Sequence, residues 1–110
     1  MGNKINVLGT EYTLEYTSEL KDCALVDAGG YTDRTSKKIV VRDIETLSIR
    51  DVEDVNIVKH EILMHELVHA FFFESGLAGY SDDETLVDWI ATQLPKIAAC
   101  YEKAISTSEV

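Results

Sequence analysis

A long stretch without glycine or proline dominates this chain of 110 residues. It begins near Asp51 and ends at Gly76. Its apolar residues recur every three or four positions, as one face of an α-helix requires: Ile57, Val58, Ile62, Leu63, Leu67, Val68, Phe71 and Phe72. The spacing predicts a helix of about six turns, with Ser48 or Asp51 as its N-cap and Gly76 as the left-handed residue after its end. Because its second half is apolar on most sides, we expect this helix to lie buried between two layers.

Short strands are predicted before this helix. Tyr12, Leu14 and Tyr16 alternate with polar residues, which is typical of a half-buried strand, and Gly9 and Thr10 predict a turn in front of it. The N-terminal part of the chain is therefore expected to form a small sheet.

A second β region is predicted from Cys23 to Arg42, with a β-branched run at its end. Lys37 and Lys38 lead into that run, and charges of this kind discourage pairing with another chain at an exposed strand. We therefore expect an edge strand there, made of Ile39, Val40, Val41 and Arg42.

A second helix is predicted to begin near residue 82, after the start signal Ser81-Asp82-Asp83-Glu84. Pro95 removes one backbone donor, so the helix is expected to kink or restart there. Its apolar residues have helical spacing on both sides of the proline: Leu86, Val87, Trp89, Ile90, Leu94, Ile97, Tyr101 and Ile105. Trp89 and the three phenylalanines at 71–73 are interpreted as core residues.

Charge and composition exclude several classes of protein. The chain has twenty acidic and ten basic residues, and the resulting net charge of -10 repels a nucleic-acid backbone. No apolar run is long enough to span a membrane, and Met1–Leu8 has no apolar secretory core, so a cytoplasmic protein is expected. Cys23 and Cys100 have no metal-binding spacing and are expected to be free, mostly buried thiols.

The middle of the long helix carries the pattern His-Glu-x-x-His at His65, Glu66 and His69. Two histidines four positions apart lie about 40° apart around a helix and roughly 6 Å apart along it, so both rings can bind one ion. In an apolar helix these ionisable groups would otherwise each cost a few kcal/mol of desolvation, on the order of 2–7. The pattern therefore predicts one Zn²⁺, with Glu66 as the general base that takes a proton from a zinc-bound water.

A catalytic zinc needs a third protein ligand, and no third histidine is placed to provide it. His60 points about 140° away from His65 and is expected to be solvated or to lie behind the ligands. Phe72 and Ser75 stand where metzincins have glycine and histidine. The ligand is therefore expected to be a carboxylate, which gluzincins supply from a separate downstream helix. Glu84 is the first choice, and the alternatives are Asp82, Asp83 and Asp88. Glu74 is expected to point away from the site.

Glu84 also has a competing role, because it could complete a capping box with Ser81. Asp88 favours the ligand role, since it lies one turn further along the same helical face. In gluzincins an acid at this place accepts the second ring N–H of the first histidine. Glu84 and Asp88 are therefore predicted to act together, as ligand and as the residue that orients His65.

Several segments resemble small phage- and prophage-encoded zinc metallopeptidases of the minigluzincin type. They are Tyr31-Thr32-Asp33, residues 37–41, the sequence HELVHAFFFESGL and the sequence DETLVDWIA, which together cover roughly residues 30–95. The resemblance implies a single α+β domain of minimal zincin fold over residues 1–110. Residues 1–76 would form a small mixed or antiparallel sheet on an active-site helix, and residues 77–110 a helical part that carries the glutamate.

The function expected from this resemblance is hydrolysis of peptide bonds by a zinc-dependent peptidase. An extended peptide would pair with the edge strand, and a peptide or protein is the expected partner, with no nucleic acid and no membrane. With no clear histidine for this role, the oxyanion would be stabilised by Tyr80, by Tyr101 or by neither. A monomer is slightly favoured. The alternative is a zinc-stabilised module that binds a protein partner with little or no hydrolysis.

Overall fold

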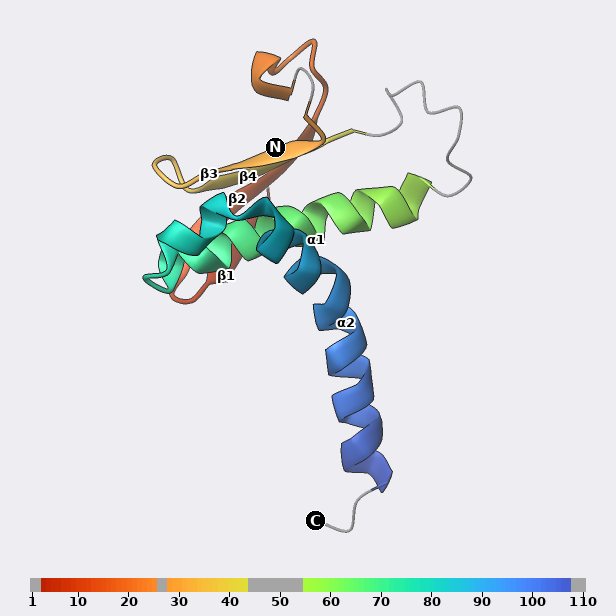
Figure 1. The fold of residues 1–110 in the computed structure, drawn as a ribbon. Coiled ribbons are helices and arrows are strands. Elements are labelled where there is room, and N and C mark those ends of the chain that lie inside the picture. Colours follow the sequence, from red (N-terminus) through yellow and green to blue (C-terminus); the bar gives the residue numbers. More distant parts are fainter. Residues whose placement is uncertain (1–2, 26–27, 44–54, 108–110) are drawn as a thin grey trace.

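The computed structural model describes residues 3–25, 28–43 and 55–107 of this chain, and it has an α+β fold (Figure 1). A four-stranded mixed sheet lies over helix α1, and helix α2 leads away from the sheet. The proposed helix caps Ser48 and Asp51 lie outside the described residues. In chain order the elements are β1 Asn3–Val7, β2 Thr10–Thr17, the 3-10 turn η1 Cys23–Leu25, β3 Gly30–Asp33, β4 Lys38–Arg42, α1 Val55–Glu74, the 3-10 turn η3 Ala78–Asp82 and α2 Glu84–Thr107.

The sheet has the order β1-β2-β4-β3. Strands β1 and β2 form an antiparallel hairpin whose turn lies at Leu8 and Gly9, one residue earlier than predicted. Both turn residues have positive φ, 49° and 93°, as a tight hairpin turn requires. Strand β4 pairs with β2 in parallel and with β3 in antiparallel. The parallel pair therefore joins two hairpins into one sheet.

The main core lies between the sheet and α1. Alternate residues of each strand face the helix, which presents its own apolar side to them. The buried cluster consists of Val7, Tyr12, Ile39, Val41 and Ala70, with Ile5, Leu14, Ile62, Leu63 and Leu67 packed against it. The strand predicted at β2 and the long helix predicted from the apolar spacing are both confirmed, but the predicted alternation ends before Tyr16, which is exposed.

The prediction that residues 39–42 form an edge strand is wrong. Strand β4 is central, and Ile39, Val40, Val41 and Arg42 are all buried. A β-branched run without alternation is typical of a strand that is covered on both faces, and this signal outweighs the two lysines before it. The free edge next to α1 belongs instead to β3.

The other face of β4 is covered by the segment around η1. Arg42 donates from Nε to the Ala28 carbonyl at 3.1 Å and from Nη2 to the Leu25 carbonyl, and it pairs with Glu19 at 3.5 Å. Leu25 itself is fully buried. Residues 23–25, which lie at the start of the second predicted β region, form a 3-10 turn that closes this side of the sheet.

Both ends of the helical hairpin follow local rules. Gly76 has a φ of 81°, and the amide of Leu77 donates to the Phe72 carbonyl at 3.1 Å, so the predicted end of α1 is confirmed. Asp83 caps α2, because its Oδ1 accepts from the Leu86 amide at 3.0 Å. The possible capping box between Ser81 and Glu84 does not form. The helix continues through Pro95 without a restart.

The C-terminal end of α1 is tied to the sheet by one carboxylate. Glu74 accepts hydrogen bonds from Thr10 Oγ1 at 2.7 Å, from the Tyr12 hydroxyl at 2.6 Å and from Lys37 Nζ at 2.8 Å. These donors lower the pKa of Glu74 to about 2, and Lys37 has the largest effect. Glu74 faces the sheet, away from His69, as predicted.

Some residues predicted to be buried are exposed. Trp89 and Phe71 are exposed, so the prediction that they belong to the core is wrong. Cys23 and Cys100 are free but also exposed, because η1 is a surface turn and the far part of α2 has nothing packed on it. Among the described residues, no helix combines the length and the apolar character that crossing a bilayer requires.

Candidate metal centre

Two histidines and one glutamate converge where α1 meets the first turn of α2. His65 Nε2 lies 3.0 Å from Glu84 Oε2, and His69 Nε2 lies 3.2 Å from Glu84 Oε1. The two Nε2 atoms are 3.2 Å apart. These are the three residues that the sequence predicted as ligands, and the structure brings them together from two helices.

The separations bring one ligand atom of each residue within 4.8 Å of the others. Ligand atoms about 2.0–2.1 Å from a tetrahedral zinc lie about 3.3 Å from one another. Each histidine is about this far from a Glu84 carboxylate oxygen, His65 from Oε2 and His69 from Oε1. Two imidazole nitrogens and one carboxylate oxygen are also a ligand set that zinc favours. His65, His69 and Glu84 could therefore hold a metal ion.

The hydrogen bonds behind the two rings support the same arrangement. His65 Nδ1 lies 2.8 Å from Asp88 Oδ1, and a carboxylate can only accept there, so Nδ1 carries the proton. In a neutral ring the Nε2 of His65 then presents a lone pair to the Glu84 carboxylate. Two acceptors facing each other need a cation between them or an additional proton on the ring, and either would join His65 to Glu84.

His69 is oriented by a residue that sequence reasoning assigned to another role. Ser81 is buried in η3, and its Oγ lies 2.6 Å from His69 Nδ1. The ring of Phe73 stacks on His69 with centroids 6.3 Å apart. The Ser81-x-x-Glu84 pattern was interpreted as a possible capping box. The serine hydroxyl and the glutamate carboxylate instead serve the two histidines.

Glu66 lies beside this group without joining it. Its carboxyl is buried and accepts from Thr32 Oγ1 at 3.0 Å, while the same hydroxyl lies 2.9 Å from the Glu66 carbonyl. Burial raises the pKa of Glu66, and the hydrogen bond from Thr32 and the nearby His65 offset this effect in part. Burial also lowers the pKa of His69, which favours the neutral ring that a metal requires.

Close packing brings β3 over Glu66. A Cβ atom at Gly30 would lie 2.7 Å from the Val40 carbonyl oxygen, 3.1 Å from Ile62 and 3.3 Å from Glu66 Cγ. The contact with the Val40 backbone therefore requires glycine at this position, and the Ile62 and Glu66 side chains would have to shift slightly for any larger residue. Thr32 and Gly30 were not predicted as site residues, because nothing local in the sequence places β3 against the middle of α1.

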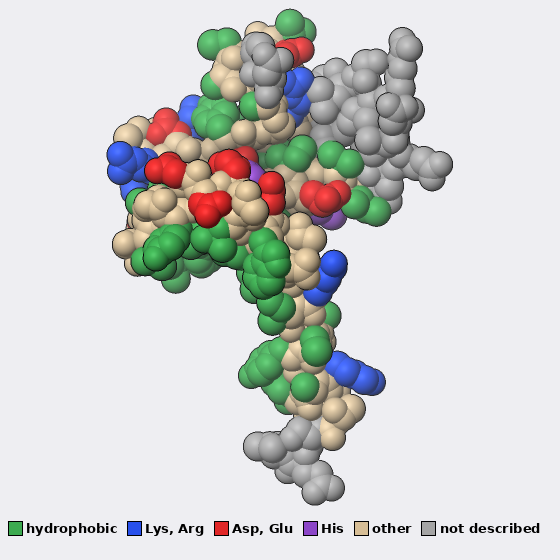
Figure 2. Space-filling model, viewed as in Figure 1, with side chains coloured by type: hydrophobic (Ala, Val, Ile, Leu, Met, Phe, Trp, Pro, Cys, Tyr) green, Lys and Arg blue, Asp and Glu red, His purple; other side chains and the backbone are tan. Residues whose placement is uncertain are grey.

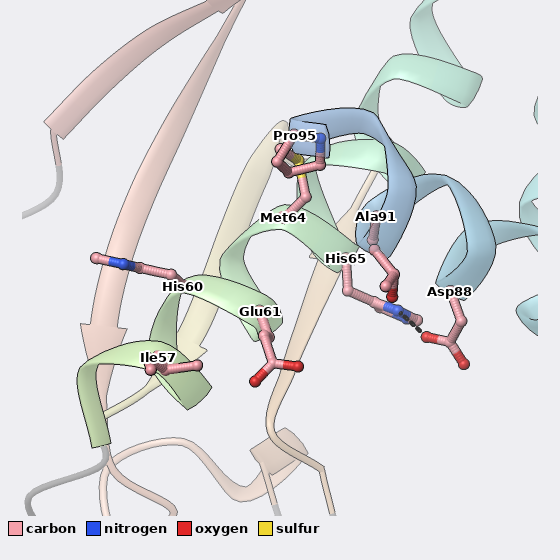
Figure 3. A pocket seen from close by; sticks show the side chains of 9 residues that line it. Ile57, His60, Glu61, Met64, His65, Asp88, Ala91 and Pro95 are labelled. Atoms are coloured by element: carbon pink, nitrogen blue, oxygen red, sulfur yellow. Dashed lines mark hydrogen bonds and ion pairs between the residues drawn. The ribbon is translucent and has the colours of Figure 1, made fainter. Parts of the chain in front are cut away.

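The three converging residues line an open pocket of about 440 Å³, with Gly30, Tyr31, Thr32, Glu66, Phe73, Ser81 and Asp82 around them. A second pocket of about 390 Å³ adjoins it beyond His65 and Asp88, and Figure 3 shows the contact between these two residues. Acidic side chains gather on this face of the molecule (Figure 2). A cleft therefore runs beneath β3.

The remaining candidates lie elsewhere. Asp83 is the cap of α2, and Asp82 is an exposed residue at the pocket rim. His60 is exposed, in line with the prediction of a solvated residue.

Tyr80 packs on Phe72 with ring centroids 6.1 Å apart, and Tyr101 lies on the far part of α2. Neither tyrosine lines the 440 Å³ pocket, so neither is placed to stabilise an oxyanion there.

Comparison with known proteins adds no assignment, because no family model, no curated protein and no solved structure matches the chain.

Proposed function

We propose that this chain is a zinc-dependent peptidase of the zincin type. His65, His69 and Glu84 would bind the zinc ion, and Glu66 would act as the general base. The observation that carries this proposal is a group of two histidines and one glutamate whose ligand atoms lie within 4.8 Å of one another, next to a buried carboxyl that does not belong to the group. The resemblance to minigluzincin-type peptidases points to the same residues.

The geometry favours a catalytic ion over a purely structural one. Structural zinc sites usually have four protein ligands, whereas catalytic sites have three and leave one position for water. Here three side chains converge at the wall of an open pocket. In the described residues Glu66 has no structural partner other than Thr32 that would account for a buried carboxyl.

When bound, zinc lowers the pKa of a water molecule and polarises the scissile carbonyl group. Glu66 takes the proton from the attacking water and delivers it to the leaving amine. Thr32 holds the Glu66 carboxyl in place, and burial raises the pKa of that carboxyl, which favours its taking up a proton. Asp88 and Ser81 fix the ring orientations of His65 and His69.

The substrate strand is proposed to pair with β3, which replaces residues 39–42 in this role. Arg42 donates its amide to the Gly29 carbonyl at 2.7 Å, so alternate residues of β3 bond to β4. By this alternation the backbone groups of Gly30 and Thr32 point away from β4, toward the cleft. They would bind an extended peptide with little demand on its sequence.

Metal analysis gives the first test. The purified chain should hold one equivalent of zinc, and His65→Ala or His69→Ala should reduce it to near zero. His60→Ala is the matched control on the same helix, because His60 is exposed and does not belong to the group of His65, His69 and Glu84. A full equivalent of zinc in either ligand variant contradicts the proposed site.

Activity gives the second test. Cleavage of an unfolded protein substrate should stop on chelation and return with zinc. Glu66→Gln should keep the metal and lose turnover by about 10²–10⁴-fold, as removal of a general base does. If the zinc-loaded chain binds unfolded peptides but does not cleave them, and Glu66→Gln behaves identically, the zinc-stabilised binding module is the correct function.

A further inference from the structure

The far part of α2 carries an apolar face that nothing in the described structure covers. From Leu94 to Thr107 the helix leaves the rest of the molecule (Figure 1). Leu94, Ile97, Tyr101 and Ile105 are 45%, 51%, 65% and 51% exposed. Figure 2 shows hydrophobic side chains along one side of this segment and basic ones along the other. A contiguous exposed stripe of this kind marks an interaction surface.

The stripe continues an interface that the chain already makes. Val87, Ile90, Leu94, Ile97 and Tyr101 recur at alternating spacings of three and four, as the seam of a helix pair requires. The first of them, Val87, is fully buried where α2 packs against α1. Beyond Leu94 no helix within residues 3–25, 28–43 and 55–107 lies opposite the same seam.

A groove lies where the covered and uncovered parts of the seam meet. It has a volume of about 410 Å³ and an almost wholly apolar lining that includes Leu8, Phe71, Leu77, Ile90 and Leu94. Leu8, Phe71 and Leu77 are exposed at its walls. The groove and the stripe therefore form one apolar surface.

The distribution of charge indicates which partner can bind this apolar surface. The chain carries a net charge of -10, so a second copy is repelled over most of its surface. The charge of residues 94–107 differs from that of the whole chain, because this segment has two basic residues, Lys96 and Lys103, and one acidic residue, Glu102. The positions that flank the seam hold no charge, being Gln93, Ala98, Cys100 and Ile105. Two copies can meet here without bringing like charges together.

We propose that two copies of this chain form a dimer through the far parts of α2, packed antiparallel. A parallel pair would place the two acidic bodies side by side, whereas an antiparallel pair separates them. Residues 94–107 span about 20 Å at 1.5 Å per residue. With Ile97 opposite the partner's Tyr101, the end of each helix reaches Leu94 of the other copy and covers the apolar groove.

Sedimentation equilibrium across a hundredfold range of concentration tests the dimer. The zinc-loaded chain should show twice the mass of one copy. Ile97→Asp should weaken association by more than about 100-fold, because it buries an unpaired charge in the seam. Ala99→Asp adds the same charge on the opposite side of the helix and should leave the dimer intact. A monomer at every concentration, or a dimer that Ile97→Asp does not weaken, overturns the proposal.

Folding and orientation are checked separately. Circular dichroism and zinc content should match the parent in each variant, and Tyr101→Asp provides a second substitution at the most exposed seam position. For orientation, Leu94→Cys and Ala104→Cys are made in a chain with Cys23→Ser and Cys100→Ser. Mixing the two proteins under mild oxidation should give the mixed disulfide. If the Leu94→Cys protein forms a disulfide only with itself and no mixed disulfide appears, the antiparallel arrangement is contradicted.

Discussion

Glu66 and Glu74 are the same residue type on the same helix, two turns apart, and their surroundings are opposite. Glu66 faces the cleft, accepts one side-chain hydrogen bond, from Thr32, and has a pKa raised mainly by burial. Glu74 faces the sheet, accepts three side-chain hydrogen bonds, and has a pKa lowered to about 2. The two carboxylates therefore differ in the number of side-chain hydrogen bonds that they accept, one for Glu66 and three for Glu74.

The difference teaches which carboxylate can do chemistry. A carboxylate whose lone pairs are all engaged by donors is stabilised in its charged form and holds elements together. One that is buried with few donors keeps a higher affinity for a proton, as a general base needs. The cleft side of α1 is therefore expected to govern activity, and the sheet side to govern stability.

The largest effect is expected from exchanging the two glutamates for glutamine. Glu66→Gln should reduce peptide cleavage by about 10²–10⁴-fold while leaving the melting temperature of the metal-free chain unchanged or raised, since it removes a buried charge. Glu74→Gln should lower that melting temperature and leave the zinc content unchanged. Activity assays and thermal unfolding of both variants measure this. If Glu66→Gln lowers the melting temperature and Glu74→Gln does not, the roles assigned to the two glutamates are wrong.

Glu84 sharpens the contrast between metal binding and folding. Glu84→Ala should reduce zinc affinity by more than about 100-fold and lower the melting temperature of the zinc-loaded form, because bound metal stabilises the folded chain. The metal-free form should hardly change, since Asp83 and not Glu84 caps α2.

Asp83→Ala is the matched control next to it. It should cost both forms about 1 kcal/mol and leave zinc affinity intact. Titration with a competing chelator, combined with thermal unfolding, separates the two variants. If Glu84→Ala destabilises the metal-free and zinc-loaded forms equally, Glu84 is not a ligand.

The residues behind the histidines should give intermediate effects. Asp88→Asn and Ser81→Ala should each reduce zinc affinity or activity by about 10–100-fold, because each releases one ring from its orientation. The same titration and assay measure this loss. Asp82→Asn is the control, as Asp82 lies at the rim and its carboxylate was only an alternative ligand. A larger loss in Asp82→Asn than in Asp88→Asn contradicts the assignment.

The smallest effect is expected in the pH dependence of stability, and it comes from Glu74 on the sheet side of α1. The ordinary pKa of a glutamate is 4.5, and in the folded chain that of Glu74 is about 2. The stabilisation from Glu74 is therefore complete above pH 4.5 and is lost as the pH falls toward 2. Glu74→Gln should flatten the acid side of the stability profile measured by urea unfolding. An unchanged acid limb shows that other groups dominate there.

What the sequence predicted correctly depended on local spacing. The helix, its end at Gly76 and the common face of His65 and His69 follow from positions a few residues apart. These predictions need only helix geometry, which is the same in every protein. The place of Asp88 behind His65 was predicted from its one-turn distance from Glu84 together with the resemblance to gluzincins, since the two residues lie on different helices.

What the sequence did not predict depended on contacts between distant segments. The two lysines before Ile39 suggested an edge strand, but the strand order is set by how the β1–β2 and β3–β4 hairpins join. Ser81 had a local role available, and only the packing of η3 against α1 brings it to His69. Thr32 reaches Glu66 across 34 positions of sequence, and neither residue's neighbours indicate this contact.

The Gly30 contact has a consequence for the order in which the protein assembles. The proposed zinc ligands all lie between residues 65 and 84, within one helical hairpin that forms from local contacts. Glu66 is covered only after β3 docks on α1, which requires the β3–β4 hairpin and its parallel partner β2. Under the proposed function, the metal site would need only the contacts within the helical hairpin, whereas the surroundings of Glu66 would also need the docked sheet.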